Sequence, residues 1–330
     1  MSNNTISAHS MYILKNKIFD IIYKVFRAIL LFGLCFLILQ PLLDKISVSF
    51  MEEKDLYDAT VISIPRNFST ENYTIALDLM RYWSSLFQTL IIVVISAALQ
   101  VFACTLAAYG FARYKFPGKN LLFMCVFLII IVPPQTILSS LYLNFQFFDI
   151  FGIARLLSGR TMNLLGTLSG YLLLSATAMG LKSGLYIFLL RQYFRGVPKE
   201  LEEAAYVDGC GRLYTFWRIM LPDALPMLTS CFLFSFVWQW TDTIFTTLFL
   251  RGYQMMPIAI SRLVESFHRY WASINAMGAG GGGIMAQPPI GYVEAVLATG
   301  MILFLIPLIL LYLGAQKMFV ESLSQTGIKM

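Results

Sequence analysis

Six apolar runs, each long enough to cross a lipid bilayer, dominate this chain of 330 residues. A helix rises about 1.5 Å per residue, so roughly 20 apolar residues span the hydrocarbon layer. Lipid offers the backbone no hydrogen-bond partners, and a closed barrel would need alternating strands of about 10 residues. The sequence therefore predicts an all-α fold, a polytopic membrane helix bundle of about six transmembrane helices. The expected spans are 25–45, 86–110, 121–143, 168–191, 225–250 and 292–315.

The composition agrees with a membrane protein. Hydrophobic residues make up 58% of the chain and charged residues 13%, with a mean hydropathy of +0.70. A soluble chain carries about a quarter charged residues. The net charge of +6 comes from short basic clusters beside apolar runs, which is the pattern of a membrane protein and not of a nucleic-acid-binding stripe. We therefore expect contact with membrane lipid and no nucleic acid.

The placement of Lys and Arg predicts the orientation. When residues at the span ends are counted with the adjoining segment, fourteen of them fall in the first, third, fifth and seventh segments outside the spans, against nine in the other segments. Cytoplasmic loops carry the excess of Lys and Arg, so both termini are expected in the cytoplasm. The first span leads into Asp44 and Lys45 without a small-residue cleavage site, which favours an uncleaved span over a signal peptide. The predicted organisation is a cytoplasmic tail at 1–24, the first span at 25–45, an extracytoplasmic loop at 46–83, a transmembrane core at 84–318 and a cytoplasmic tail at 319–330.

The outer segments carry few functional motifs. The aromatic side chains of the loop at 46–83 are compatible with a packed external cap or with a merely solvated loop. The run from Gly278 to Gly283 lacks the Lys-Ser/Thr that completes a phosphate-binding loop, and we expect a flexible hinge there. GxxxxGK[ST] does not occur anywhere in the chain. If this protein uses ATP, another subunit must bind it.

Catalytic and metal-binding patterns are not found either. The two histidines, His9 and His268, are far apart in the sequence, and HExxH and GxSxG are both missing. The five cysteines show no metal-ligand spacing, and four of them sit in apolar runs, where buried small side chains are expected. We therefore predict no catalytic residue, no metal and no cofactor in this chain.

The polar stretch between the fourth and fifth spans has clear helix signals. Pro198 suits a first helical turn, and residues 199–208 can continue it until Gly209 and Gly211. A second short helix is expected over 212–220, stopped by Leu221-Pro222. In the first helix one face carries Leu201, Ala204, Ala205 and Asp208 at i, i+3, i+4, i+7 spacing, with glutamates to its sides. Small alanines beside carboxylates suit a docking surface, although a plain polar surface helix has the same pattern.

The amino-acid sequence of this stretch also resembles a known motif. "EAAYVDGCGRLYTFWRIMLP" resembles the EAA loop of permease subunits of binding-protein-dependent ABC importers. "LAAYGFARYKFPGKN" and "FLLRQYFRGVPKELEEAAYVDG" are similar to the carbohydrate-type, maltose-permease-like branch of that family. Three departures leave the solute open: "GLKSGLY" where many relatives carry Pro, "WQWTD" where Trp-Asn is common, and a tail, "QTGIKM", that only loosely matches the usual ending.

The resemblance implies an ABC type I importer permease fold and a place in the prokaryotic cell membrane, as a multi-pass protein. It implies a transport subunit, not an enzyme, that translocates a sugar or oligosaccharide. The implied partners are two ATP-binding subunits that hold ATP-Mg, a second homologous permease and an extracytoplasmic solute-binding protein. The EAA loop, residues 196–222, would dock on the ATPase. Its implied coupling positions are Glu203, Ala204, Ala205, Asp208, Gly209, Ile219 and Pro222.

The solute pathway is predicted from polar and aromatic residues inside the spans. Lys182 and Asp242 are ionisable residues at membrane depth, which makes them functional candidates. An ion pair between them, a hydrated cavity and snorkelling to the surface all remain open. Side chains that offer aromatic faces or hydrogen bonds to a sugar, or that anchor a span end instead, are Tyr142, Asn144, Trp238, Gln239 and Trp240.

Two other functions remain open on this basis. One is the same kind of permease for a peptide, amino acid or other polar solute, although the Gly-Cys-Gly-Arg wording after Asp208 disfavours peptides. The other is a self-contained secondary transporter or membrane enzyme, which would predict inverted repeats, broken spans or a buried acid/His cluster, and the sequence shows none of these three features.

Overall fold

The computed structural model describes residues 3–58, 60–61, 64–149, 152, 155–156, 159–278 and 287–327. In these ranges the chain is built of helices, joined by turns and two isolated bridges. The helices are α1 (Asn3–Ser49), α2 (Glu71–Leu79), α3 (Tyr82–Arg113), α4 (Lys119–Ile131), α5 (Leu138–Gln146), α7 (Leu168–Ala176), α8 (Ser183–Gly196), α9 (Glu200–Val207), α10 (Arg212–Thr215), α11 (Leu221–Asp223), α12 (Leu225–Thr241), α13 (Ile244–Phe249), α14 (Met256–Ser261), α15 (Leu263–Gly278) and α16 (Ile290–Gly327).

The chain divides into two compact units. The first comprises the residues up to Thr74 together with Pro288–Ile302. Within it the outer loop is packed, because Phe50 stacks on Phe68 at 4.8 Å and the Asp55 carboxylate accepts the backbone N–H of Asn67 at 2.7 Å. The hydrogen bonds that the Asp55 carboxylate accepts, above all the one from the Asn67 N–H, hold the pKa of Asp55 below its usual value. For this part of the loop, the packed cap is the right alternative.

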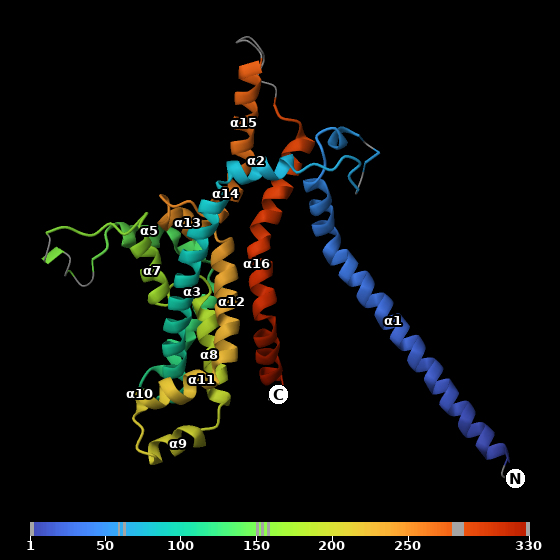
Figure 1. Cartoon of the computed structure of the whole chain (residues 1–330). Coiled ribbons are helices and arrows are strands. Elements are labelled where there is room, and N and C mark those ends of the chain that lie inside the picture. The colour runs from blue at the N-terminus through green and yellow to red at the C-terminus, as the bar shows by residue number, and fades with distance from the viewer. Residues whose placement is uncertain are drawn as a thin grey trace. The chain divides into compact units, whose positions relative to one another are not determined.

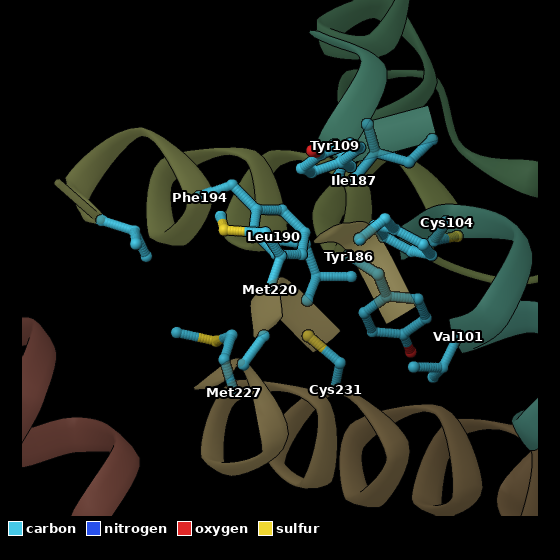
Figure 2. Close-up of a cluster of buried hydrophobic side chains, with 14 of the residues drawn as sticks. Val101, Cys104, Tyr109, Tyr186, Ile187, Leu190, Phe194, Met220, Met227 and Cys231 are labelled. Atoms are coloured by element: carbon cyan, nitrogen blue, oxygen red, sulfur yellow. The ribbon is translucent and has the colours of Figure 1, made fainter. Parts of the chain in front are cut away.

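The second unit, Ile75–Gln287 with the residues from Leu303 onward, is a helix bundle around α3. In Figure 1, α8 and α12 run beside α3, and each of them packs against it. Apolar side chains from these three helices fill the space between them, as Figure 2 shows. Tyr186, Leu190 and Cys231 have no exposed surface there, so this cluster is the core of the unit.

Three helices of the described chain are long and apolar enough to cross a membrane by themselves: Asn16–Ser49, Tyr82–Arg113 and Ile290–Met318. Two bent pairs raise this to five if each is one span. Lys119–Ile131 continues into Pro134–Gln146 at an angle of 104°, and Arg212–Asp223 continues into Leu225–Thr241 at 74°. The prediction of an all-α polytopic bundle is confirmed.

The predicted continuous helices over 121–143, 168–191 and 225–250 are wrong, because each is interrupted. Pro133 and Pro134 end α4, since proline has no N–H and its ring clashes with the preceding turn. The residues 177–182 separate α7 from α8, and Ala178 and Lys182 there have positive φ angles of 54° and 60°. Asp242 ends α12 with extended backbone.

Two further expectations concern single residue types. Cys104 and Cys231 are buried as predicted, whereas Cys35 and Cys125 are exposed, so apolar runs did not bury all four cysteines. The hinge expected over Gly278–Gly283 lies outside the described residues except for Gly278, which ends α15.

Candidate functional site

The EAA loop begins as the sequence predicts. α9 covers Glu200–Val207, and Gly209 follows it with a φ of +81°. The N–H of Cys210 donates to the carbonyl of Ala205 at 2.9 Å, and the N–H of Gly209 donates to that of Tyr206 at 3.1 Å. These two bonds form a Schellman motif, in which glycine supplies the left-handed conformation. Gly211 has an ordinary φ of −72°, so only Gly209 is required at the turn.

One face of α9 is fixed to the bundle by a buried acid. The Glu202 carboxylate accepts the Tyr109 hydroxyl at 2.9 Å and lies 3.3 Å from Nε of Arg113, both on α3. The Arg113 side chain also donates to the carbonyl of Val197 at 2.9 Å. The side chains of Arg113 and Glu202 are 6% and 10% exposed. Separating an ion pair with so little water access would leave a buried charge uncompensated, which opposes movement of the loop away from the end of α3.

The face of α9 that the i, i+3, i+4, i+7 spacing predicts is divided between two environments. Ala205 is buried, but it shares its face with Glu202, while Leu201, Ala204 and Asp208 are exposed. The helical spacing alone placed Glu202 to the side of that face and did not predict its burial. A carboxylate is rarely buried without a partner. The signal for that partner was the pair Tyr109 and Arg113, four residues apart on one face at the end of an apolar run.

The opposite face of α9 points away from the bundle. Glu203 and Ala204 are exposed, and the Val207 side chain is 87% exposed. Ala204 leaves room for close approach of a partner backbone, Glu203 offers a charge, and Val207 offers apolar surface. This face, defined by Glu203, Ala204 and Val207, is called the docking face below.

The second half of the EAA loop does not stop at Leu221-Pro222 as predicted. α10, a π-helical turn over Phe216–Met220 and α11 follow one another without a break to Asp223. Pro222 falls in the first turn of α11, where a missing N–H costs nothing. Ile219 is half-buried and Pro222 is exposed, so of these two implied coupling positions only Pro222 shares the exposure of the docking face.

A cavity of about 410 Å³, with both apolar and polar lining residues, lies where the helices are interrupted. It is lined by the end of α4 with Pro133 and Pro134, by Leu181 and Lys182 before α8, and by Trp238 and the residues 241–245. Irregular backbone at membrane depth is tolerated only where protein covers it or water reaches it. Three breaks around one cavity therefore mark a hydrated or partner-covered site.

Lys182 and Trp238 meet at this cavity. Nζ of Lys182 lies 4.9 Å from the centre of the Trp238 ring, a cation–π contact. The Lys182 side chain is half-buried and its backbone is left-handed, a conformation that costs a residue with a side chain about 1–2 kcal/mol. In the described chain no ion pair joins Lys182 to Asp242, although both line the cavity.

Asp242 has a local role. One carboxylate oxygen accepts the N–H of Ile244 at 3.2 Å, and the other accepts the N–H of Thr246 at 3.0 Å. The carboxylate therefore caps the first turn of α13, whose free N–H groups carry partial positive charge. This bonding also explains why α12 ends at Thr241, since the side chain of Asp242 competes for backbone partners.

The other predicted solute residues are not brought together with this pair. Tyr142 lines a separate, more open cavity of about 590 Å³ with Ser139 and Arg251. Asn144 is exposed and lies 3.5 Å from the Ser140 hydroxyl. Trp240 is fully buried and stacks on Phe236. Of the predicted set, only Lys182, Trp238 and Asp242 line the cavity at the breaks.

Gln239 belongs to a buried polar network that the sequence analysis missed. Its side chain donates to Gln100 Oε1 at 2.7 Å, and the Gln100 amide donates in turn to the carbonyl of Leu181 at 2.8 Å and to the Ser183 hydroxyl at 2.7 Å. The Ser235 hydroxyl also donates to Gln100, at 2.8 Å. The network thus satisfies backbone and side-chain groups at the break before α8. Its signal was polar residues at i, i+4 spacing inside apolar runs: Ser96 with Gln100 on α3, and Ser235 with Gln239 on α12.

Comparison with known proteins identifies relatives over most of the chain. The family described as "Binding-protein-dependent transport system inner membrane component" matches residues 100–325. A probable ABC transporter permease protein of Pyrococcus horikoshii is 31% identical over 69% of this chain and 77% of its own. A maltodextrin transport system permease protein of Bacillus subtilis is 27% identical over 93% and 96% of the two chains. A polygalacturonan/rhamnogalacturonan transport system permease protein of the same organism is 26% identical over 94% and 97%.

A solved structure has the same fold. It is described as a bacterial ABC transporter involved in the import of the acidic polysaccharide alginate. The superposition has a TM-score of 0.65 and covers 90% of this chain and 96% of the other, at 19% sequence identity. At that identity the likeness establishes the arrangement of the helices, and it leaves the cargo of this chain undecided.

Proposed function

This chain belongs to the family of inner membrane components of binding-protein-dependent transport systems, and we propose that it translocates a sugar or oligosaccharide. It is a multi-pass protein of the prokaryotic cell membrane and a transport subunit, since its relatives are ABC transporter permeases. Such permeases work with an ATPase and a solute-binding protein. The proposal adds two ATP-binding subunits, a second homologous permease and delivery of the solute from outside the cell.

The docking face of the EAA loop is the observation that carries the proposal. A coupling element must be rigid on the side of the membrane bundle and free on the side of its partner. α9 meets both conditions, because Glu202 is bound to Arg113 while Glu203, Ala204 and Val207 are exposed. Closure of ATPase subunits on such a helix would move the bundle as a body between inward and outward states. ATP shifts that equilibrium only by its differential affinity for the two states.

The proposal of sugar as cargo rests on two kinds of support. The maltodextrin and polygalacturonan permeases of Bacillus subtilis are similar over nearly the whole chain. The cavity at the breaks adds the Trp238 ring and the polar groups of Gln135 and Thr241, which suit the apolar face and hydroxyls of a sugar. A non-sugar polar solute remains the alternative. The two relatives carry a neutral and an acidic sugar respectively, so similarity leaves the charge of the cargo open.

A self-contained secondary transporter would need no ATPase. The broken helices do not separate this reading from an importer, because discontinuous helices at mid-membrane also line the sites of secondary transporters. Membership of a binding-protein-dependent family favours the importer. A measurement of whether uptake depends on ATP would distinguish the importer from a secondary transporter.

The first test is a charge reversal on the docking face. We expect Glu203→Lys to leave the protein in the membrane while ATPase co-purification and solute uptake fall by about tenfold or more. Like charges brought together at an interface cost several kcal/mol, and about 1.4 kcal/mol already changes an affinity tenfold. Co-purification of the ATPase with the tagged permease and uptake into vesicles are measured together.

Glu265→Lys is the matched control, because it reverses the charge of an exposed helical glutamate on α15, outside the EAA loop. We expect it to retain the ATPase. Normal uptake and normal ATPase association in Glu203→Lys would contradict the proposed docking. Uptake without any ATPase would instead support a secondary transporter.

A further inference from the structure

The cavity at the breaks holds a cation whose charge is not balanced by an acid. Among the described residues, no carboxylate lies within 4.0 Å of Nζ of Lys182, and its contact is the Trp238 ring. A Lys in a membrane span is normally paired or reaches the water at the surface. Lys182 does neither within this chain, because it is half-buried at a wall of the cavity.

The acid that shares the cavity is already occupied. Both oxygens of Asp242 accept backbone N–H groups of α13, and the second also lies 3.4 Å from the Thr246 hydroxyl. Its negative charge is therefore directed at the positive end of a helix. Of the two charged residues that line the cavity, Lys182 is therefore the one whose charge is available to a solute.

The local structure makes Lys182 an unfavourable choice for stability alone. It stands at the N-terminal end of α8, where a cation opposes the positive end of the helix dipole. It also has a left-handed backbone, although asparagine or glycine would adopt that conformation with less strain. Residues that break local rules without a structural gain are expected where function requires them.

The neighbourhood is built to hold this position fixed. Gln100 binds the carbonyl of Leu181, the residue before Lys182, and also binds the Ser183 hydroxyl on its other side. An added Cβ at Gly180 would come within 2.9 Å of the Gln100 amide, so the chain passes close to that side chain. The backbone that carries Lys182 is thus clamped on both sides, and the volume of about 410 Å³ beside it is within the usual range for small-molecule sites.

We propose that the transported solute is an anionic sugar, and that its acid group binds Lys182 as it passes through this cavity. The acid group replaces the Trp238 ring as the partner of the ammonium, which frees the ring to stack on the sugar. Gln135, Thr241 and Thr243 offer hydrogen bonds to its hydroxyls. The assignment rests on the proposed function and specifies the chemical class of its cargo.

The test uses the complete transporter in proteoliposomes, with its ATPase, partner permease and binding protein. The probes are trigalacturonate, its uncharged trimethyl ester, glucose 6-phosphate and maltotriose. We expect uptake of one of the two anions and little of the neutral sugars. Lys182→Met should reduce that uptake about tenfold, since a single charge lining a cleft raises the local concentration of an oppositely charged solute by that order. Lys182→Arg keeps the charge and should retain most of the uptake.

A second measurement reads the charge of the cavity without a cargo. Thr241→Cys, in a background without the five native cysteines, is labelled by a negatively charged and a positively charged methanethiosulfonate of similar size. We expect the rate of labelling by the negative reagent, divided by the rate for the positive reagent, to fall about tenfold in Lys182→Met and to remain unchanged in Lys182→Arg.

The outcomes separate the two proposals. Trigalacturonate uptake identifies a carboxylate as the anion, and glucose 6-phosphate uptake identifies a phosphate. Uptake of maltotriose or the ester that is indifferent to Lys182→Met overturns the anionic cargo and leaves the importer intact. An unchanged labelling ratio overturns it as well, even if no probe is transported. Loss of ATPase association and of all ATP-dependent uptake in the unmodified complex would instead contradict the proposed function.

Discussion

Glu202 and Glu203 are neighbours in the sequence, but α9 places them in opposite environments. Successive residues of a helix are about 100° apart, so one carboxylate turns toward Arg113 and the other toward the solvent. The same chemical group therefore has two roles. Glu202 fixes the helix to the bundle, and Glu203 is available to a partner.

Glu202→Gln should loosen the EAA loop without unfolding the bundle. The substitution keeps the size of the side chain and an acceptor for Tyr109, but it leaves the Arg113 guanidinium buried without a carboxylate. Removing one partner of a buried ion pair costs about 3–5 kcal/mol. We expect amide hydrogen exchange in α9 to accelerate, while exchange in α8 and α12 stays slow. The double variant Glu202→Gln with Arg113→Met should lose less protection of α9 against exchange, expressed as free energy, than the sum of the losses in the two single variants. Strictly additive losses would show that the two side chains do not interact.

Gly209→Ala tests the turn, since nothing lies within 4 Å of the added Cβ and only the backbone conformation resists it. A left-handed φ of +81° costs alanine about 1–2 kcal/mol. We expect weaker ATPase co-purification, because the strain is relieved by turning the end of α9. Gly211→Ala is the matched control, with a φ of −72° and equally open space. Equal effects of the two substitutions would contradict a conformational role for Gly209.

At the scale of elements, the interrupted helices follow from three different local causes. Proline ends α4, an aspartate side chain ends α12, and positive φ angles at Ala178 and Lys182 accompany the gap between α7 and α8. The first two causes are visible in the sequence. The third is stabilised from a distance, because Gln100 on α3 supplies the hydrogen bond that the carbonyl of Leu181 would otherwise lack.

Gln100→Leu should therefore destabilise the bundle at the break. It removes the hydrogen bond to the Leu181 carbonyl and the acceptor of the Ser235 hydroxyl, and each buried group without a partner costs about 1–3 kcal/mol. A drop in the thermal unfolding temperature of several degrees is expected, measured on the detergent-solubilised protein. Gln40→Leu, the same exchange at an exposed position of α1, should have little effect. Similar losses in both variants would mean that the network contributes nothing specific.

At the scale of the molecule, α3 links the docking face to the cavity. Arg113 holds α9 at one end, and Gln100, 13 positions earlier, holds the backbone beside Lys182. At 1.5 Å per residue these two contacts are about 20 Å apart along one helix. We therefore expect α3 to transmit a displacement of α9 to the cavity.

This linkage predicts that ATP changes the accessibility of the cavity only while the ion pair between Glu202 and Arg113 is intact. In the complete transporter, the labelling rate of Thr241→Cys should change about tenfold or more between the ATP-bound and nucleotide-free states, as expected for alternating access. Adding Glu202→Gln should reduce that change while ATP still binds. A full response in the absence of the Glu202–Arg113 pair would show that the movement follows another route.

The sequence by itself determined the helical class, the first, second and last spans, and the turn at Gly209. These follow from local causes, namely runs of apolar side chains and the conformational freedom of glycine. Tertiary structure alone decided that Glu202 is buried, that Gln239 belongs to a core network, and that Lys182 and Trp238 share a cavity while Tyr142 lies elsewhere. Each of these depends on a partner far away in the chain, at separations such as the 93 residues between Tyr109 and Glu202. Periodicity within one segment describes the faces of a helix, but the residue that meets each face is set by how the helices pack.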